Sequence, residues 1–165
     1  MAVRDDFSAG EVLAAADLND TFASKLDLAG GKILQIVRAT DSTNRSTTST
    51  SFVDASISIT ITPQKSDSAL LLIWTAAALH FSTSNFLLLQ IADTSNNPIS
   101  GAESPAIGST TTAHFEAPIT LIGYATPATT SAVTYKGRFR VSASGTGRLV
   151  NASATGQLFA LEVSA

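Results

Sequence analysis

The segment from residue 56 to 62 carries the most informative pattern in the chain, because apolar and hydroxyl side chains alternate along it without a break. Ile57, Ile59 and Ile61 alternate with serine and threonine, and Pro63 follows directly. Successive side chains of a β-strand point to opposite faces of the sheet, so this period predicts a strand with one buried and one solvent-exposed face. The proline ends it. Such a segment favours a core built between β-sheets.

The composition agrees with a β fold. The 165 residues suit one domain plus an appendage. Charged residues make up only 14% of the chain, against about 25% in typical soluble domains, whereas serine and threonine number 21 each. Threonine, which is β-branched, suits half-exposed strands. The 44% hydrophobic content excludes a disordered chain, and the absence of cysteine excludes disulfides, thiolate zinc sites and thiol catalysis.

Further strands are predicted by short apolar runs that turn-forming residues separate. The predicted strands cover residues 31–40, 56–62, 69–81, 86–92, 114–125, 132–144 and 148–163. Residues 41–51 and 93–112 are predicted to be connections, and Gly145-Thr146-Gly147 a hairpin turn. About eight strands at this spacing predict an all-β protein with an antiparallel β-sandwich or jelly-roll-like body.

Two of these predicted strands, 69–81 and 86–92, are apolar on both faces. Strands of this kind are covered twice. In a small sandwich the opposite sheet provides one cover, and the simplest second cover is a neighbouring subunit.

The first 30 residues differ from the rest. They carry a net charge of −4, from six acidic and two basic side chains, and Leu18, Phe22 and Leu26 recur at helical spacing. Asp17 is a suitable N-cap, so a short helix is predicted from about Asp17 to Lys25, where it is too short to be stable without a packing partner. Gly30-Gly31 breaks the pattern. The chain is therefore divided into an N-terminal anchor, residues 1–30, and a β-sandwich domain, residues 31–165.

Several functional classes do not fit this sequence. An acidic leader on a nearly neutral body does not resemble a nucleic-acid-binding protein. The N-terminus lacks the features of a secretion signal, and the longest apolar run, 69–79, is well short of the roughly 20 residues of a membrane helix. We expect a protein made in a cytoplasm, with neither nucleic acid nor membrane as a partner.

No catalytic or cofactor motif is present. The two histidines, His80 and His114, have no second ligand at suitable spacing, and the oxygen-rich stretch 93–97 lacks the pattern of a calcium loop. No nucleophile elbow, P-loop or dinucleotide-binding motif occurs. We therefore expect no enzyme activity, no metal and no cofactor.

A cationic stripe is predicted on one strand. Lys136, Arg138 and Arg140 alternate with aromatic and small or aliphatic residues, so the three cations share one strand face. The simpler interpretation is a solvated face. The alternative is a docking stripe for an acidic surface, either on a partner protein or on the leader of a neighbouring subunit.

Residues 7–19, which read FSAGEVLAAADLN, resemble the FTAGEVLTAADLN leader found at the start of many small structural proteins of tailed bacteriophages. Similar features follow: GKILQIV from Gly31, a Ser/Thr tract, Phe52, and a hydroxyl-alternating strand that ends in Thr62-Pro63. The resemblance covers about the first 75 residues. Ala14 stands where the pattern frequently has threonine, which removes a hydroxyl cap there.

The resemblance implies a virion component: an N-terminal anchor on the particle and a β-sandwich displayed outward, usually as a homotrimer. The expected partners are other copies of the chain and the major capsid protein or another virion protein. The leading hypothesis is a capsid decoration (cement) or head-fibre protein on the outer surface of the virion. The alternative is a tail-fibre or baseplate-attached receptor-binding protein that recognises host glycans through residues 93–112, with Trp74 or Tyr124 as stacking candidates. The expected anchoring residues are Phe7, Val12, Leu13, Leu18, Phe22 and Leu26.

Overall fold

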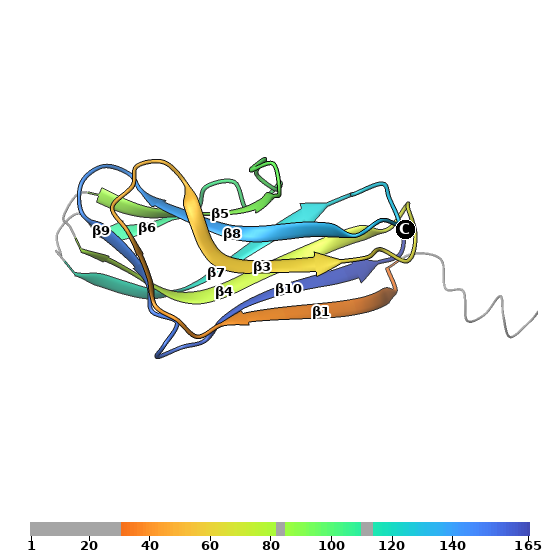
Figure 1. Cartoon of the computed structure of the whole chain (residues 1–165), viewed down its shortest axis with the longest axis horizontal. Coiled ribbons are helices and arrows are strands. Elements are labelled where there is room, and N and C mark those ends of the chain that lie inside the picture. The colour runs from red at the N-terminus through yellow and green to blue at the C-terminus, as the bar shows by residue number, and fades with distance from the viewer. Residues whose placement is uncertain (1–30, 82–84, 110–113) are drawn as a thin grey trace, which may run out of the picture.

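The computed structural model describes residues 31–81, 85–109 and 114–165, and this part of the chain is all-β, with no helix. Figure 1 shows long strands that run roughly along the longest axis of the molecule. The strands are β1 (Ile33–Asp41), β2 (Arg45–Thr47), β3 (Val53–Ile61), β4 (Ala69–Phe81), β5 (Asn85–Asp93), β6 (Ala106–Ser109), β7 (Phe115–Ala125), β8 (Val133–Val141), β9 (Thr146–Leu149) and β10 (Gly156–Val163).

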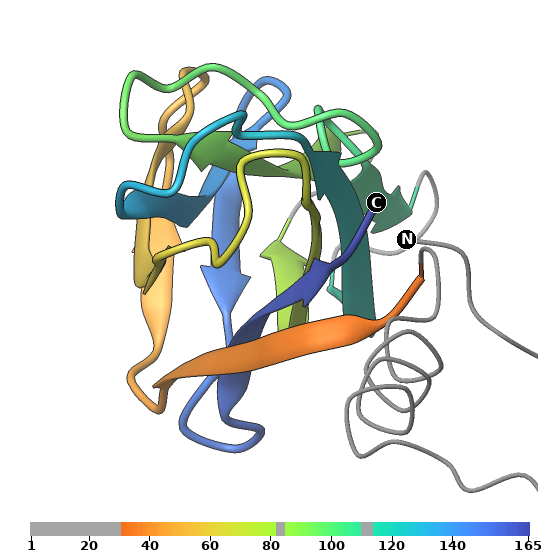
Figure 2. The same cartoon turned by 90° about the vertical axis from the view of Figure 1, so that its right-hand side faces the viewer.

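The strands form two antiparallel sheets. In the six-stranded sheet, β4 pairs with β7 along one edge, and along its other edge with β10 and then β9. β1 continues this sheet beyond β10, and β2 beyond β9. The four-stranded sheet has the order β3-β8-β5-β6. In Figure 2 the first strand, in orange, lies alongside the last, in dark blue.

One hydrophobic core lies between the two sheets, as the alternation of side chains predicts. In β3, Ile57, Ile59 and Ile61 are buried while Ser58 and Thr60 are exposed. The same alternation buries Leu70, Leu72 and Trp74 of β4 from the other side. Ser56 has a positive φ of 57° beside a register shift in the β3–β8 pairing, and its amide donates to the Asp54 side chain at 2.8 Å.

The strand prediction is correct, to within about three residues at each end, for β1, β3, β4, β5, β7 and β8, and it misses two short strands. β4 has the predicted bounds, but the predicted connections 41–51 and 93–112 contain β2 and β6. These strands have only three and four residues, so their pattern is too short to stand out. They form because β9 and β5 lie beside them.

The predictions between residues 145 and 163 need two corrections. The segment 148–163 is not one strand, because residues 151–154 form a turn whose Asn151 side chain donates to Asp41 Oδ2 at 3.0 Å. Gly145-Thr146-Gly147 is not a hairpin turn either, since β8 and β9 belong to different sheets. Thr146 and Gly147 already pair with β4. Both features depend on contacts with residues far away in the sequence.

Both ends of the described body lie at the same end of the sandwich. The Gly31 amide donates to the Ser164 carbonyl at 3.0 Å, and the Ser164 amide donates to the Lys32 carbonyl at 2.9 Å. Residues 1–30, with the predicted helix and the expected anchoring residues Phe7, Val12, Leu13, Leu18, Phe22 and Leu26, lie outside the described residues.

Candidate assembly face and pocket

The outer face of the six-stranded sheet carries rows of apolar side chains. The pairing register places Ile36, Leu161, Leu71 and Tyr124 in one row across β1, β10, β4 and β7. The next row contains Arg38, Phe159, Ile73 and Ile122, and a shorter row contains Ile33, Val163 and Ala69. Residues directly opposite each other in a sheet share one face, so these rows form one surface.

We call this surface the apolar face. It comprises Ile33, Ile36, Leu71, Ile73, Ile122, Tyr124, Phe159, Leu161 and Val163.

The apolar face is open to solvent in the single chain. Ile36 is 59% exposed, Tyr124 57%, Ile122 54% and Ile33 51%. The following row, with Thr40, Gln157, Thr75 and Thr120, is polar and gives the face a boundary. A contiguous exposed apolar area with a polar rim is typical of an interaction surface.

The two strands predicted to be apolar on both faces therefore differ. β4 buries one face in the core and contributes the other to the apolar face. The outward side of β5 is partly covered by its own chain: Gln90 and Ala92 are buried, and Gln90 Nε2 donates to the Glu103 carbonyl at 3.0 Å. Only β4 retains a surface that lacks a second cover among the described residues.

The cationic stripe faces outward on β8, as the alternation predicts, but its members are engaged within the chain. Arg138 donates to the Phe52 carbonyl at 2.8 Å and to Gln90 Oε1 at 3.0 Å, and Arg140 donates to the Thr50 carbonyl at 3.2 Å. Both guanidinium groups lie over the Phe52 ring. Lys136 lies 3.7 Å from Asp54.

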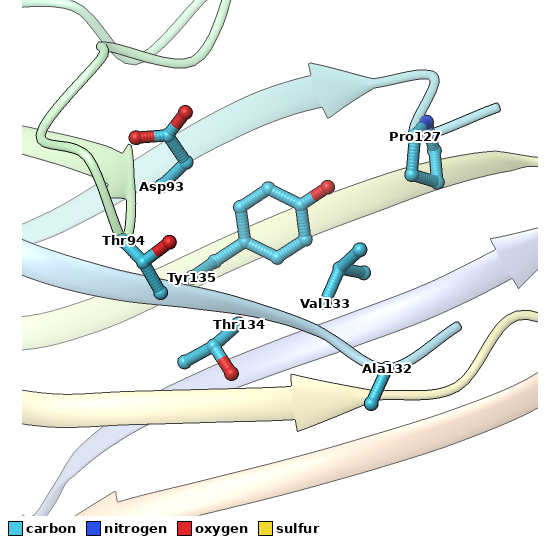
Figure 3. Close-up of a pocket in the computed structure, with 7 residues that line it drawn as sticks. All are labelled: Asp93, Thr94, Pro127, Ala132, Val133, Thr134 and Tyr135. Atoms are coloured by element: carbon cyan, nitrogen blue, oxygen red, sulfur yellow. The ribbon is translucent and has the colours of Figure 1, made fainter. Parts of the chain in front are cut away.

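A pocket of about 330 Å³ opens at the end of β5 and the start of β8 (Figure 3). Its lining residues are Asp93, Thr94, Pro127, Ala132, Val133, Thr134 and Tyr135. Asp93 and Tyr135 are directly paired across β5 and β8, which places their side chains on the inward side of the sheet. Trp74 lies in the core and Tyr124 on the apolar face, so neither stacking candidate lines this pocket.

Two buried carboxylates, which no motif or spacing in the sequence marks, hold loops in place. Glu162 is fully buried and accepts hydrogen bonds from Gln35 Nε2, the Ser68 hydroxyl and the Gln64 and Lys65 amides. Burial by itself raises the pKa of Glu162, but these hydrogen bonds outweigh it and leave the pKa below its usual value.

Asp41 is the second. Its pKa is lowered, chiefly by the Arg45 side chain, which donates to it at 2.9 Å, and further by hydrogen bonds from Thr43 and Asn151. Neither carboxylate has a second carboxylate as partner among these contacts. Both accept hydrogen bonds from neighbouring loop residues, which is typical of a carboxylate that stabilises the fold.

No group of three or more potential metal ligands occurs among the residues that the structure describes. His80 is buried in β4, and the His114 ring lies edge-on to Phe81 at 5.1 Å between centroids. No helix within the described ranges is long and apolar enough to cross a membrane.

Comparisons with family models and with curated proteins returned no match to this sequence.

Proposed function

We propose that the chain is a non-enzymatic virion structural protein of a tailed bacteriophage, a capsid decoration or head-fibre protein. It assembles as a homotrimer and is attached to the particle through residues 1–30. The leader FSAGEVLAAADLN supports the virion assignment, and the number of three subunits follows from the same resemblance.

The strand order supports the proposal at the level of the fold. The strand order is β1-β10-β4-β7 in one sheet and β3-β8-β5-β6 in the other. These two orders match those of a jelly roll made of two Greek keys. We therefore assign the body to the jelly-roll type of sandwich. Viral capsid proteins use this architecture, although a fold by itself does not determine a function.

The apolar face is the observation that carries the proposal of self-assembly. It lies on the outer side of β1, β10, β4 and β7, and four of its members are more than half exposed in the single chain. Ile33, the first residue of this face in the chain, is two residues from Gly31, where the leader joins the body. Burial of this face between copies would place the three leaders close together around the symmetry axis.

Solution mass tests the assembly. The full chain is expected to be a trimer by light scattering, and Ile122→Lys is expected to give a folded monomer, because a lysine inside the interface would lose its hydration. Thr60→Lys, on the outer face of β3, is the matched control and should remain a trimer. A monomeric wild-type chain would overturn this part of the proposal.

Location tests the virion role. Antibodies raised against the body, used to label purified tailed-phage particles in the electron microscope, are expected to mark many sites over the head. Labelling confined to the tail or baseplate would favour the alternative, a receptor-binding protein for host glycans. The pocket at Asp93 and Tyr135 is the structural feature that favours this second candidate.

A further inference from the structure

The Tyr135 hydroxyl presents a polar group that the fold leaves unused. Tyr135 is only 5% exposed and packs in the core, yet it lines the pocket. Among the described residues no group hydrogen-bonds to its hydroxyl. In Figure 3 the ring lies in the middle of the pocket with the hydroxyl directed toward Pro127. The hydroxyl is open to the pocket and is not sealed in the core, so a water molecule or a ligand group can hydrogen-bond to it.

Asp93 supplies a fixed acceptor on the other side of the Tyr135 ring from the hydroxyl (Figure 3). The Asn97 amide donates to Asp93 Oδ1 and the Asn97 side chain donates to Oδ2, both at 2.8 Å. The Ser95 amide also donates to this carboxylate, and because a carboxylate has about four acceptor positions, one remains available. The Asn97 side chain is also the main reason that the pKa of Asp93 is lowered, and the group is ionised at neutral pH.

The remaining walls combine apolar and hydroxyl groups. Pro127, Ala132 and Val133 are apolar, and Thr94 carries a hydroxyl. The Thr134 hydroxyl is paired with Thr60 at 2.7 Å, so it is already satisfied. A volume of about 330 Å³ is at the lower end of the range for small-ligand pockets.

These groups discriminate between classes of ligand. An anion would be repelled by the Asp93 carboxylate, and a wholly apolar molecule would leave the carboxylate and the Tyr135 hydroxyl unpaired. A small cation would pair with the Asp93 carboxylate but would leave the Tyr135 hydroxyl and the apolar wall without a matching partner. A neutral ring with several hydroxyls and one apolar face satisfies both polar groups and the apolar wall.

We propose that the pocket between Asp93 and Tyr135 binds one neutral saccharide ring, whose hydroxyls donate to Asp93 and pair with the Tyr135 hydroxyl. The ring could be the terminal unit of a surface polysaccharide or a free monosaccharide, which share this chemistry. The inference goes beyond the assembly role, because the pocket is complete within one chain and does not require the apolar face.

The test is saturation-transfer NMR on the full chain with glucose, galactose and N-acetylglucosamine, followed by titration of any sugar that binds. Glucuronic acid and methylammonium serve as anionic and cationic probes. At least one neutral sugar is expected to bind while both charged probes fail. Oligosaccharides ending in the same sugar distinguish the two sources, since tighter binding of the oligomer assigns the site to a polymer end and equal binding assigns it to a free ring.

Tyr135→Phe is the decisive variant, because it removes the hydroxyl and no hydrogen bond within the described chain. It should unfold at the same temperature as wild type and bind the sugar about tenfold more weakly, the effect of one lost hydrogen bond. Ser58→Ala, which removes an exposed hydroxyl from the outer face of β3, is the control and should bind normally. The proposal is overturned if no neutral sugar binds by about 10 mM, if only methylammonium binds, or if Tyr135→Phe binds as wild type does.

Discussion

Glu162 fixes the connection between β3 and β4 against the last strand. Its Oε1 accepts from the amides of Gln64 and Lys65 at 2.8 and 3.2 Å and from the Ser68 hydroxyl at 2.6 Å. Three donors converge on one oxygen of a fully buried side chain. A charged acceptor suits this geometry best, because hydrogen bonds to an ionised group are about twice as strong as neutral ones.

Glu162→Gln should therefore lower the free energy of unfolding by about 1–3 kcal/mol, since the amide keeps one acceptor oxygen but loses the charge. Urea denaturation followed by the fluorescence of Trp74, the single tryptophan, measures the change. Glu116→Gln, at an exposed position of β7, is the matched control and should stay within about 0.5 kcal/mol of wild type. Equal stability of the two variants would mean that the convergence on Glu162 contributes nothing.

The stability of the fold should depend on pH through the two buried carboxylates, Asp41 and Glu162. The pKa values of Asp41 and Glu162 are both lowered in the folded chain, so the unfolded chain binds protons more readily. Their contribution is present above the unfolded-state pKa values, about 4, and is lost as the pH falls through the folded values. Urea midpoints are expected to fall between pH 6 and pH 3 by less in Glu162→Gln than in wild type. A parallel fall in both would rule out this role of Glu162.

At the scale of single elements, β8 approaches β4 closely at one glycine. A Cβ added at Gly137 would lie 2.9 Å from the Ile57 side chain and 3.0 Å from the Trp74 ring. Gly147, in β9, is also crowded, but there the nearest atom is the end of the flexible Leu87 side chain. The two glycines therefore differ in how easily the neighbour can move.

Gly137→Ala is expected to destabilise the fold by about 1–3 kcal/mol, because a rigid ring must shift in a packed core. It should also change the emission of Trp74, which reports on the same contact. Gly147→Ala is the matched control, with a smaller loss and an unchanged emission spectrum. A larger loss at Gly147 than at Gly137 would contradict this account of the packing.

The cationic stripe of β8 gives a further prediction. Arg138 and Arg140 hold residues 50–52 through backbone carbonyls and the Phe52 ring, so we expect the double variant Arg138→Glu, Arg140→Glu to lose about 1–3 kcal/mol of stability. Its mass in solution should be that of wild type. Failure of the folded variant to assemble would instead favour the docking stripe for an acidic surface.

Strands were predictable from the sequence where the pattern is long. The alternation around Ile57 and the apolar run of β4 each cover enough residues for their period to be unambiguous. β2 and β6 exist because a partner strand lies beside them, and the break between β9 and β10 depends on Asn151 reaching Asp41. The sequence contains no local signal for such long-range pairs.

The candidate sites were likewise predictable from local pattern but not where they depend on long-range pairing. The outward direction of Lys136, Arg138 and Arg140 was predictable from alternation, whereas their contacts with Phe52, Thr50 and Asp54 were not. The pocket could not be predicted, because Asp93 and Tyr135 are 42 positions apart and meet only through the β5–β8 register. A sequence pattern gives the face of a side chain, and the topology determines its neighbours.

At the scale of the whole molecule, the low charged fraction of 14% corresponds to a definite surface. Hydroxyl residues cover the outer face of β3, whereas the apolar face covers β1, β10, β4 and β7 on the other sheet. The composition is thus uneven in space: the outer face of one sheet carries hydroxyl groups, and the outer face of the other is apolar and exposed in the single chain.

Removal of residues 1–28 separates assembly from attachment. β1 starts at Ile33 and its whole pairing with β10 is retained, so the shortened chain should fold and keep the apolar face. We expect a trimer by light scattering and a β spectrum by circular dichroism. The shortened chain should no longer sediment with particles that bind the full-length protein, because the proposed anchoring residues lie in the deleted segment.

The control keeps the length of the leader and changes only its apolar side chains. In the full chain, Leu18→Asp, Phe22→Asp and Leu26→Asp together should have the same effect as the deletion, since charge on the apolar stripe of the helix that the sequence predicts there would prevent its burial. A single substitution, Ser8→Asp, should leave binding intact. Co-sedimentation of the shortened chain at the wild-type level would place the attachment in the body, and the apolar face would then be the first surface to test as the contact with the particle.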